Sequence, residues 1–424
     1  MNILLFSLIT TALLLTQVVL TTASAAEQLN KTSSILTTTP SPTHFAVKEG
    51  KIIDLKNKKP LFFKGIGYSP YLIGETPLLG ANPGNDERYH EHLAIMRDMG
   101  VNYLHVFPLK MPSKFFAQLD ITDMVYGQDI WLDGYVPDFL AVDYQALMWN
   151  LIKETIDHTY RIGRPDRLVL FSIGDELQAK SVISTDNRNP SVRNFTGNHV
   201  VVTNRTPTEI ALAKLIDKAI EYELNTYGRR HLYCHTSWTH IGPLKRPDLD
   251  LPYKNALVPD MGDLVCLNIY TYARGVMSSP PGSTTDSTYQ GYLEELASST
   301  EKPIFITQVG LSTSNIESKP ATAPGFGGHK EKDVPSVFKS IWKDLHTAKG
   351  KEKFCGISFF ELQDEWWKSG EDPVDSTRHE QDDPEEWFGL FQVGPDRHLI
   401  PKKNIPNTLR ELYTSSPNTL TPKR

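Results

Sequence analysis

The sequence has few of the groups that several common protein classes require. Its only cysteines are Cys234, Cys266 and Cys355, and an odd number excludes a purely internal disulfide framework. No cysteine and histidine spacing typical of a metal site occurs, so we expect no metal and no cofactor. Long basic runs are absent and the net charge is -6, which argues against nucleic acid as a partner.

Long apolar runs are also scarce, and only one of them is long enough to span a membrane. Residues 3–20 are almost wholly apolar or hydroxylic, and Ala23-Ser24-Ala25 follows them. This pattern predicts a secretory signal peptide over residues 1–25, with an uncleaved signal anchor as the alternative. We therefore expect a secreted, extracellular protein with no stable membrane anchor.

The segments at the two ends of the folded region differ from it in composition. Residues 26–44 are rich in Ser, Thr and Pro, which predicts a disordered leader, and residues 414–424 are expected to form a flexible tail. Asn30, Asn194 and Asn204 each begin an N-x-S/T triplet, as in secreted glycoproteins.

Between these ends, strand-like and helical patterns alternate over residues 45–413. The strands are expected at Leu61–Gly67, Val101–Phe107, Met124–Leu132, Leu168–Ile173, Arg230–Thr236, Asp263–Tyr270, Pro303–Gln308 and Phe354–Glu361. Helices are expected at Asp86–Met99, Val142–Tyr160, Thr208–Tyr227, Ser287–Ser298, Val334–Thr347 and Leu399–Tyr413. This order predicts an α/β fold, one (β/α)8 TIM barrel. A doubly wound sheet would need a Gly-rich phosphate loop after its first strand, and that loop is missing.

Additions to the barrel are expected at its start and at one rim. Residues 45–55 resemble a small β-hairpin with a turn at Glu49-Gly50. Two polar or Gly- and Pro-rich segments, Ser181–Thr206 and Ser312–Lys332, exceed ordinary connections in length. We expect them to be long loops on the top face that border a site.

The run Leu168–Glu176 ends abruptly in Gly174, Asp175 and Glu176 after six apolar or small residues. It is typical of a buried strand that carries two carboxylates to its carboxyl end, where the active sites of parallel barrels lie. The alternative is that both acids only cap a following helix.

Other expected strands end in polar or aromatic side chains as well. These are Tyr68, Trp238, Asn268, Tyr270, Gln308, Glu361 and Trp366. No Ser occupies a nucleophile-elbow motif, which argues against a serine hydrolase. Carboxylates framed by aromatic rings suit glycoside chemistry, in which one carboxylic acid protonates the leaving oxygen.

The order of these motifs resembles that of clan A glycoside hydrolases, and most of all the β-1,3-glucanosyltransferase family. Similar segments are Pro60–Pro70, Phe171–Glu176, Asn268–Tyr270, Pro303–Gly310 and Phe359–Lys368. The resemblance implies that Glu176 is the acid/base and that Tyr270 contacts the nucleophile. From their places at the expected strand ends, we expect the following residues to bind substrate: Tyr68, Asp175, Trp238, Asn268, Glu361 and Trp366.

The chain departs from that family at two positions of this motif set. Asp175 stands where the family has Asn, and Gln308 stands where the family has its nucleophilic Glu. A neutral amide does not attack an anomeric carbon as a carboxylate does. We expect a Gln308→Glu variant to gain hydrolytic activity.

Three hypotheses about function remain open. The first is a hydrolase or transglycosylase on β-linked oligosaccharide or polysaccharide, with Glu361 or Asp364 replacing the missing carboxylate. The second is a substrate-assisted hydrolase similar to N-acetylhexosaminidases, in which adjacent Asp and Glu position the acetamido group and donate the proton. The third is a catalytically impaired pseudoenzyme that keeps its cleft and binds glycan.

Overall fold

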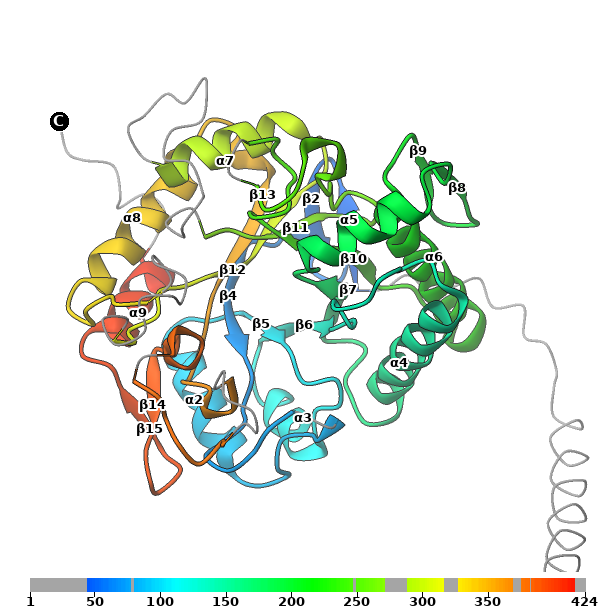
Figure 1. Cartoon of the computed structure of the whole chain (residues 1–424). Coiled ribbons are helices and arrows are strands. Elements are labelled where there is room, and N and C mark those ends of the chain that lie inside the picture. Colours follow the sequence, from blue (N-terminus) through cyan, green and yellow to red (C-terminus); the bar gives the residue numbers. More distant parts are fainter. Residues whose placement is uncertain are drawn as a thin grey trace, which may run out of the picture. The chain divides into compact units, whose positions relative to one another are not determined.

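Eight parallel strands close into a barrel that a ring of helices surrounds (Figure 1). The computed structural model describes residues 44–77, 80–246, 249–270, 288–315, 327–368, 375–381 and 383–415. The barrel strands are β4 (Phe63–Tyr68), β5 (Tyr103–Val106), β6 (Val125–Ile130), β7 (Leu168–Asp175), β10 (Leu232–Trp238), β11 (Val265–Asn268), β12 (Ile304–Val309) and β13 (Phe354–Phe359). The predicted (β/α)8 barrel is confirmed.

The helices alternate with these strands along the chain. They are α2 (Arg88–Asp98), α3 (Ser113–Leu119), α4 (Val142–Arg161), α5 (Ala179–Arg188), α6 (Pro207–Tyr227), α7 (Thr288–Ser299), α8 (Val334–Thr347) and α9 (Ile405–Thr414). Helix α6 shows how the sequence sets their ends, because Thr206 and Glu209 form a reciprocal capping box and Gly228 closes the helix in the left-handed conformation.

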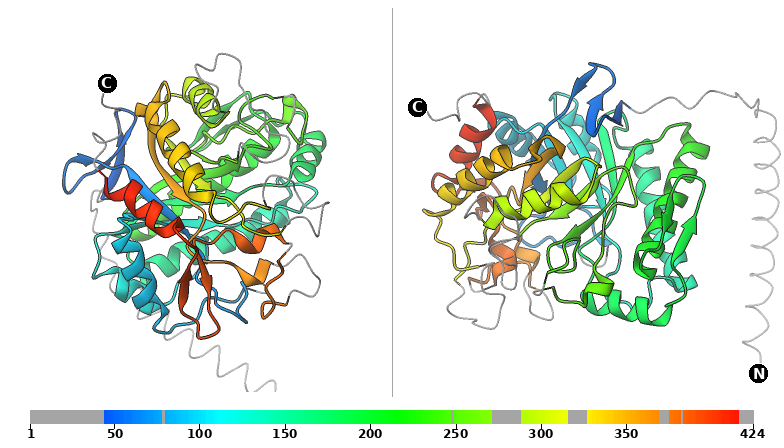
Figure 2. Two further views of the ribbon diagram at one scale, coloured as in Figure 1. Left: turned by 90° about the vertical axis from the view of Figure 1, so that its left-hand side faces the viewer. Right: turned by 90° about the horizontal axis from the view of Figure 1, so that it is seen from above.

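Three short strands precede the barrel in the described part of the chain. The expected hairpin at the start is present as β1 (Phe45–Lys48) and β2 (Lys51–Asp54), with β3 (Lys59–Pro60) as a third strand. Phe45 and Ile52 pack into the same apolar cluster as the barrel interior, so the hairpin covers the end at which the strands begin (Figure 2). All three cysteines lie in this interior cluster as free, buried thiols.

Two sequence expectations were wrong in their secondary structure. The segment expected as the loop Ser181–Thr206 instead contains most of α5 and a hairpin, β8 (Asn194–Thr196) with β9 (Val201–Thr203). The apolar face of α5 packs on the helix layer, because Val182 and Thr185 are fully buried. The helix expected over Leu399–Tyr413 begins only at Ile405, since β15 (Leu399–Pro401) first pairs with β14 (Phe391–Val393).

Strand β7 illustrates why the barrel strands read as apolar runs. Every residue of its segment Leu168–Asp175 is buried. One side of the strand contributes to the barrel interior and the other packs under the helices, as expected for a parallel strand covered on both faces. This burial carries the polar end of β7 into a water-poor environment, where the next residues form the candidate site.

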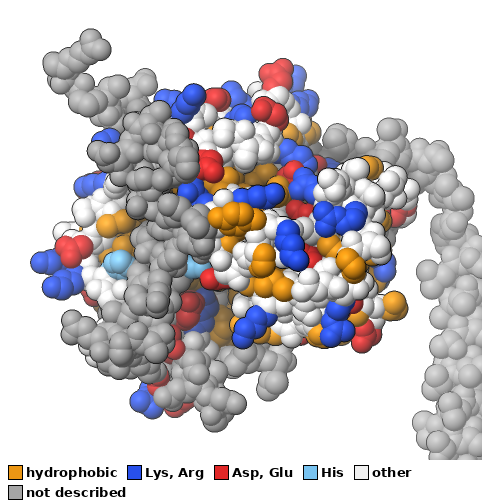
Figure 3. Space-filling model, turned by 45° about the horizontal axis from the view of Figure 1, so that its top comes forward, with side chains coloured by type: hydrophobic (Ala, Val, Ile, Leu, Met, Phe, Trp, Pro, Cys, Tyr) orange, Lys and Arg blue, Asp and Glu red, His pale blue; other side chains and the backbone are white. Residues whose placement is uncertain are grey.

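The predicted signal peptide and leader, like the tail from residue 416, lie outside the described residues, so the domain boundaries stay predictions. No helix within the described ranges has the length and apolar character needed to cross a membrane. The face in Figure 3 carries basic, acidic and apolar side chains interspersed, without segregation of one kind where they are coloured.

Candidate active site

Five predicted site residues come together at the carboxyl ends of β7, β11 and β12. Asp175 is the last residue of β7, and Glu176 follows it with a backbone φ of 46°. Asn268 ends β11 and is paired in register with Gln308 of β12. Tyr270 follows β11 by two residues and is buried. The barrel therefore gathers these side chains from three strands, as the sequence predicted.

The Asn268 amide joins the two adjacent acids. Its Nδ2 donates to Oδ1 of Asp175 at 2.9 Å and to Oε1 of Glu176 at 2.7 Å. The Thr307 hydroxyl donates to Oδ1 of Asn268 at 2.6 Å, which fixes the orientation of the amide. Because one nitrogen serves both carboxyl groups, the two accepting oxygens lie close together, and Asn268 positions Glu176 directly.

Gln308 is engaged at both ends of its amide. Its Nε2 donates to Oδ2 of Asp175 at 3.0 Å, and its Oε1 accepts from the Tyr270 hydroxyl at 3.1 Å. The side chain is buried. Asp175 thus accepts an amide N–H at each of its two oxygens, and the neutral Gln308 stands where the resemblance implies a carboxylate.

Burial dominates the protonation of this cluster. It raises the pKa of Glu176 to about 7, while the hydrogen bond from Asn268 opposes the shift. Burial also raises the pKa of Asp175 well above its usual range, and the charges of Asp129 and Glu176 add to the shift. A carboxyl group whose pKa lies near 7 can donate and accept a proton under neutral conditions.

Asp129 is a member of this cluster that the sequence analysis missed. It lies on β6 beside Ser172 of β7 and is fully buried. Burial raises its pKa to about 8, and Ser172 and Trp131 donate toward it in contacts that lack full hydrogen-bond geometry. The available signal was a charged residue within an otherwise buried barrel strand, which is rare without a partner or a function.

The acids at the end of β13 have other partners. Asp364 forms a fully buried ion pair with Lys402, 2.6 Å between Oδ1 and Nζ, and also accepts from the Gly389 N–H. Glu361 is fully buried with no hydrogen bond to either carboxyl oxygen, and burial raises its pKa well above the usual range. The structure therefore assigns Asp364 to a structural ion pair and leaves Glu361 uncommitted.

Two charged side chains from the segment after β13 influence the pKa of Glu176. Lys368, in η5 (Trp366–Lys368), pairs with Glu365 at 2.9 Å. The Lys368 charge lowers the pKa of Glu176, whereas that of Glu385, in η6 (Pro384–Trp387), raises it. These two opposing charges place η5 and η6 within electrostatic reach of the candidate acid.

The predicted aromatic residues divide into two groups. The indole N–H of Trp238 donates to the carbonyl of Leu177, next to Glu176, at 3.3 Å. Trp366 instead stacks on His379, with ring centroids 4.8 Å apart. Tyr68 is fully buried, and its hydroxyl lies 3.1 Å from Nδ1 of His92 on α2, so the structure does not bring it to the acids.

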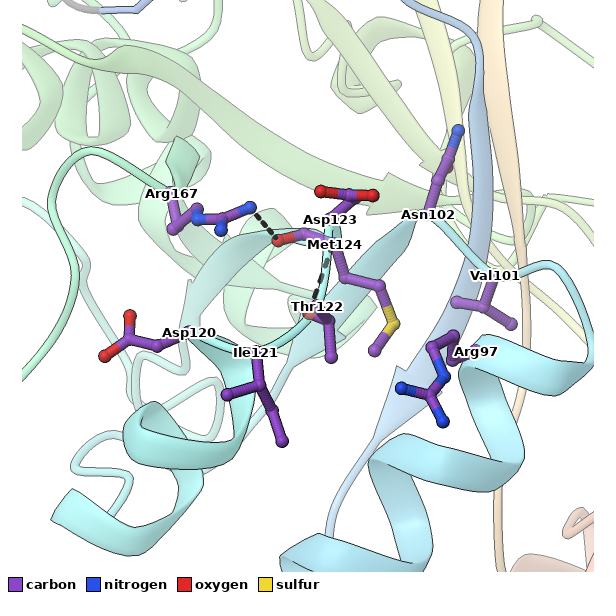
Figure 4. A pocket seen from close by; sticks show the side chains of 9 residues that line it. All are labelled: Arg97, Val101, Asn102, Asp120, Ile121, Thr122, Asp123, Met124 and Arg167. Carbon is purple, nitrogen blue, oxygen red and sulfur yellow. Dashed lines mark hydrogen bonds between the residues drawn. The ribbon is translucent and has the colours of Figure 1, made fainter.

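Two cavities of the described structure lie elsewhere. The larger, about 490 Å³, lies where β5 and β6 begin, at the end of the barrel opposite to Glu176 (Figure 4). The smaller, about 230 Å³, lies beside α5 and the short helix η2 (Tyr253–Asn255). Neither is lined by the carboxyl groups described above, so the case for this site rests on the hydrogen-bonded cluster.

Comparison with solved structures finds a similar barrel fold in several proteins of low sequence identity. A β-glucuronidase from Ruminococcus gnavus matches with a TM-score of 0.54 and 13% identity, over 87% of this chain and 52% of its own. A β-glucuronidase from Bifidobacterium dentium gives 0.55 and 14%, over 87% and 48%. ScGas2 gives 0.52 and 12%, over 89% and 70%. The fold is that of known glycoside hydrolases.

The likeness at these identities shows the fold alone. The chain spans about half the length of the β-glucuronidases that it matches. No protein-family model matches the chain, and no match to a curated protein sequence was found. The assignment of an activity therefore depends on the chemistry of the residues at the ends of β7, β11 and β12.

Proposed function

We propose that this chain is a glycan-active protein and that Glu176 is the proton donor and acceptor at the glycosidic oxygen. The observation that carries the proposal is the position of Glu176 at the carboxyl end of β7, oriented by Asn268 and with a pKa of about 7. Such a carboxyl group can protonate a leaving oxygen and later deprotonate an incoming hydroxyl. The shared barrel of the β-glucuronidases supports this reading.

Asp175 lies close to Glu176, because both accept from the same nitrogen of Asn268. Gln308 has no charge with which to stabilise an oxocarbenium-like centre. Hydrolysis or transfer of a β-linked glycan would therefore depend on Asp175, or on an acetamido group that the substrate itself supplies. Asp364 is a weaker candidate since its carboxylate is bound to Lys402.

A second candidate function is glycan binding without turnover. The amide of Gln308, held between Asp175 and Tyr270, favours it, because this position offers hydrogen bonds but no nucleophile. Both functions predict glycan binding at the same end of the barrel and differ in whether a glycosidic bond is broken.

An activity screen separates these functions. Wild type and Glu176→Gln are incubated with β-glucan and with N-acetylhexosaminide oligosaccharides, and products are measured by chromatography. We expect wild-type cleavage or transfer that Glu176→Gln abolishes, while both proteins retain binding by calorimetry. If glycan binds but no product forms, glycan binding without turnover is the function that remains. If none of the glycans binds or reacts, the glycan-active proposal is rejected.

We further propose that the protein is secreted as a glycoprotein. Residues 3–20 and Ala23-Ser24-Ala25 motivate the proposal. Asn194 and Asn204 are exposed on the β8–β9 hairpin and in the turn after it, as an attachment site for a glycan must be. Amino-terminal sequencing of protein from the culture medium should begin near Ala26, and an intact Met1 would refute the cleavage.

A further inference from the structure

The segment that follows β6 leaves two large aromatic side chains exposed. Trp131 is 49% exposed and Tyr135 is 81% exposed, although Leu132 between them is buried. Large aromatic rings bury much apolar area on average, although Trp is rarely fully buried and Tyr is intermediate. Their exposure on one short segment, at the carboxyl end of a barrel strand, makes this surface a candidate for ligand binding.

The backbone between these rings is fixed. The carbonyl of Asp133 accepts from the Tyr144 hydroxyl at 2.9 Å, and the Asp133 side chain accepts from the Tyr135 N–H at 2.9 Å. Leu132 packs against the neighbouring strand, since a Cβ built on Gly174 would lie 3.2 Å from its Cδ1. A rigid segment presents its aromatic rings at little cost in conformational entropy on binding.

The same segment lies against the residues that follow Glu176. A Cβ built on Gly134 would lie 3.6 Å from the backbone nitrogen of Gln178 and 3.8 Å from Cα of Leu177. Trp238 donates to the Leu177 carbonyl from the other neighbouring strand. The backbone just after Glu176 is therefore flanked by the segment of Trp131 on one side and by Trp238 on the other.

Trp131 combines an apolar face with buried acceptors. Trp131 follows Asp129 by two residues at the end of β6, and its indole lies near enough to the Asp129 carboxyl group to lower the pKa of that group. The charge of Asp129 in turn raises the pKa of Asp175. A pyranose ring has one face of C–H groups and an edge of hydroxyl groups, so it matches an exposed indole beside carboxyl oxygens.

We propose that Trp131 and Tyr135 form a sugar-binding subsite for pyranose units beyond the two that flank the glycosidic bond held at Glu176. This inference rests on the proposed function and adds the direction in which the glycan runs, over the end of β6. A glycan long enough to reach Trp131 contacts both the indole and the Glu176 site, whereas a disaccharide seated at Glu176 contacts only the latter.

The test is a comparison of glycan lengths. Binding of β-1,3-linked glucose oligosaccharides and of chito-oligosaccharides, from disaccharide to hexasaccharide, is measured by calorimetry for wild type, Trp131→Ala and Trp131→Phe. We expect Trp131→Ala to weaken hexasaccharide binding about fivefold to tenfold and to leave the disaccharide unchanged. Trp131→Phe should retain most of the affinity because it keeps a flat ring.

The matched control is Ile121→Ala. Ile121 is 65% exposed and precedes β6, so it lies at the other end of the same strand, about 20 Å away by strand geometry. This variant should bind every length as wild type does. Equal affinities of wild type and Trp131→Ala for the hexasaccharide, or equal losses at every length, would overturn the subsite alone.

Two further outcomes are informative. Wild-type protein that binds neither oligosaccharide series would reject the proposed function and the subsite together. The second outcome is a dimer, detected by sedimentation analysis, that the Trp131→Ala substitution dissociates. That result would assign the exposed rings to contact with a second copy of the chain and would overturn the sugar assignment.

Discussion

Asp175 and Gln308 form one hydrogen-bonded unit, and the chemistry of either residue depends on the other. The amide nitrogen of Gln308 lies 3.0 Å from Oδ2 of Asp175, and the opposite end of the amide accepts from Tyr270. The family that the sequence resembles has Asn and Glu at these two positions. Amide and carboxylate have thus exchanged places, and the pair still contains one carboxyl group.

The variant Gln308→Glu would place a second carboxyl oxygen against Asp175. Asp175 already has a raised pKa, and two unit charges about 3 Å apart would repel by about 5 kcal/mol at an effective dielectric constant of 20, so the two groups would not ionise together. Binding one proton at pH 7 to a group whose unperturbed pKa is about 4.3 costs only about 3.7 kcal/mol. The pair should therefore take up a proton, and the variant should gain little of the activity expected from sequence alone.

The double variant Asp175→Asn/Gln308→Glu avoids this repulsion. In the double variant, the amide of Asn at position 175 would donate to the carboxylate at position 308, which reverses the direction of the wild-type hydrogen bond. Asn268 would still donate to an oxygen at position 175, and Tyr270 would still donate to an oxygen at position 308. We expect the double variant to be as stable as wild type within about 1 kcal/mol. It should also place an ionised carboxylate at position 308, and we expect it to cleave a β-glucan faster than either the wild type or the single variant.

Stability and activity measurements at two pH values test this reasoning. The added carboxyl group of Gln308→Glu has a raised pKa in the folded state. The variant should therefore lose no unfolding free energy near pH 4, and its loss should grow as the pH rises above the pKa of the group in the unfolded state. Denaturant unfolding should show a loss of up to about 3 to 4 kcal/mol at pH 7 relative to wild type. A single variant that is fully stable at pH 7, or as active as the double variant, would refute the argument.

Two other predictions concern charges near the site. Glu385→Gln removes a charge that raises the pKa of Glu176, so the loss of activity at high pH, or the NMR titration of the Glu176 carboxyl, should move to lower pH by a few tenths of a unit. No change, or a move to higher pH, would contradict it. Lys402→Met leaves Asp364 buried without its cation and should cost about 3 to 5 kcal/mol in denaturant unfolding, with Asp364→Asn/Lys402→Met recovering part of the loss. A cost below about 1 kcal/mol would show that Asp364 does not depend on Lys402.

The sequence predicted the barrel and much of the cluster because both depend on strand order. The apolar run of β7 ends at its acids, and parallel strands bring their carboxyl ends to one rim, so Glu176, Asn268 and Gln308 could be placed together. The contact between Asp175 and Gln308 could not be predicted, because β10 and β11 separate β7 from β12 and side-chain rotamers decide the contact.

The orientation of single residues at strand ends was the least predictable feature. A shift of one residue along a strand moves a side chain from the barrel interior to the helix layer. A Cβ on Gly67 would lie 3.2 Å from Cβ of Glu361, so Gly67 faces inward and the next residue, Tyr68, packs on His92. Asp129 was missed for a related reason, since the polar residues of β6 obscured which of them faces the interior.

Burial raises the pKa of Glu176 to about 7 although position 308 carries no charge. A neutral Gln308 lacks the negative charge with which a carboxylate at this position would raise the pKa of Glu176. In the structure, burial is the largest influence on its pKa, which stands at about 7 beside the neutral amide. The capacity to donate a proton and the capacity to stabilise a positive centre are therefore supplied separately in this site. Under the proposed function, Glu176 would provide the first through its raised pKa, and the second would depend on Asp175 or on the substrate.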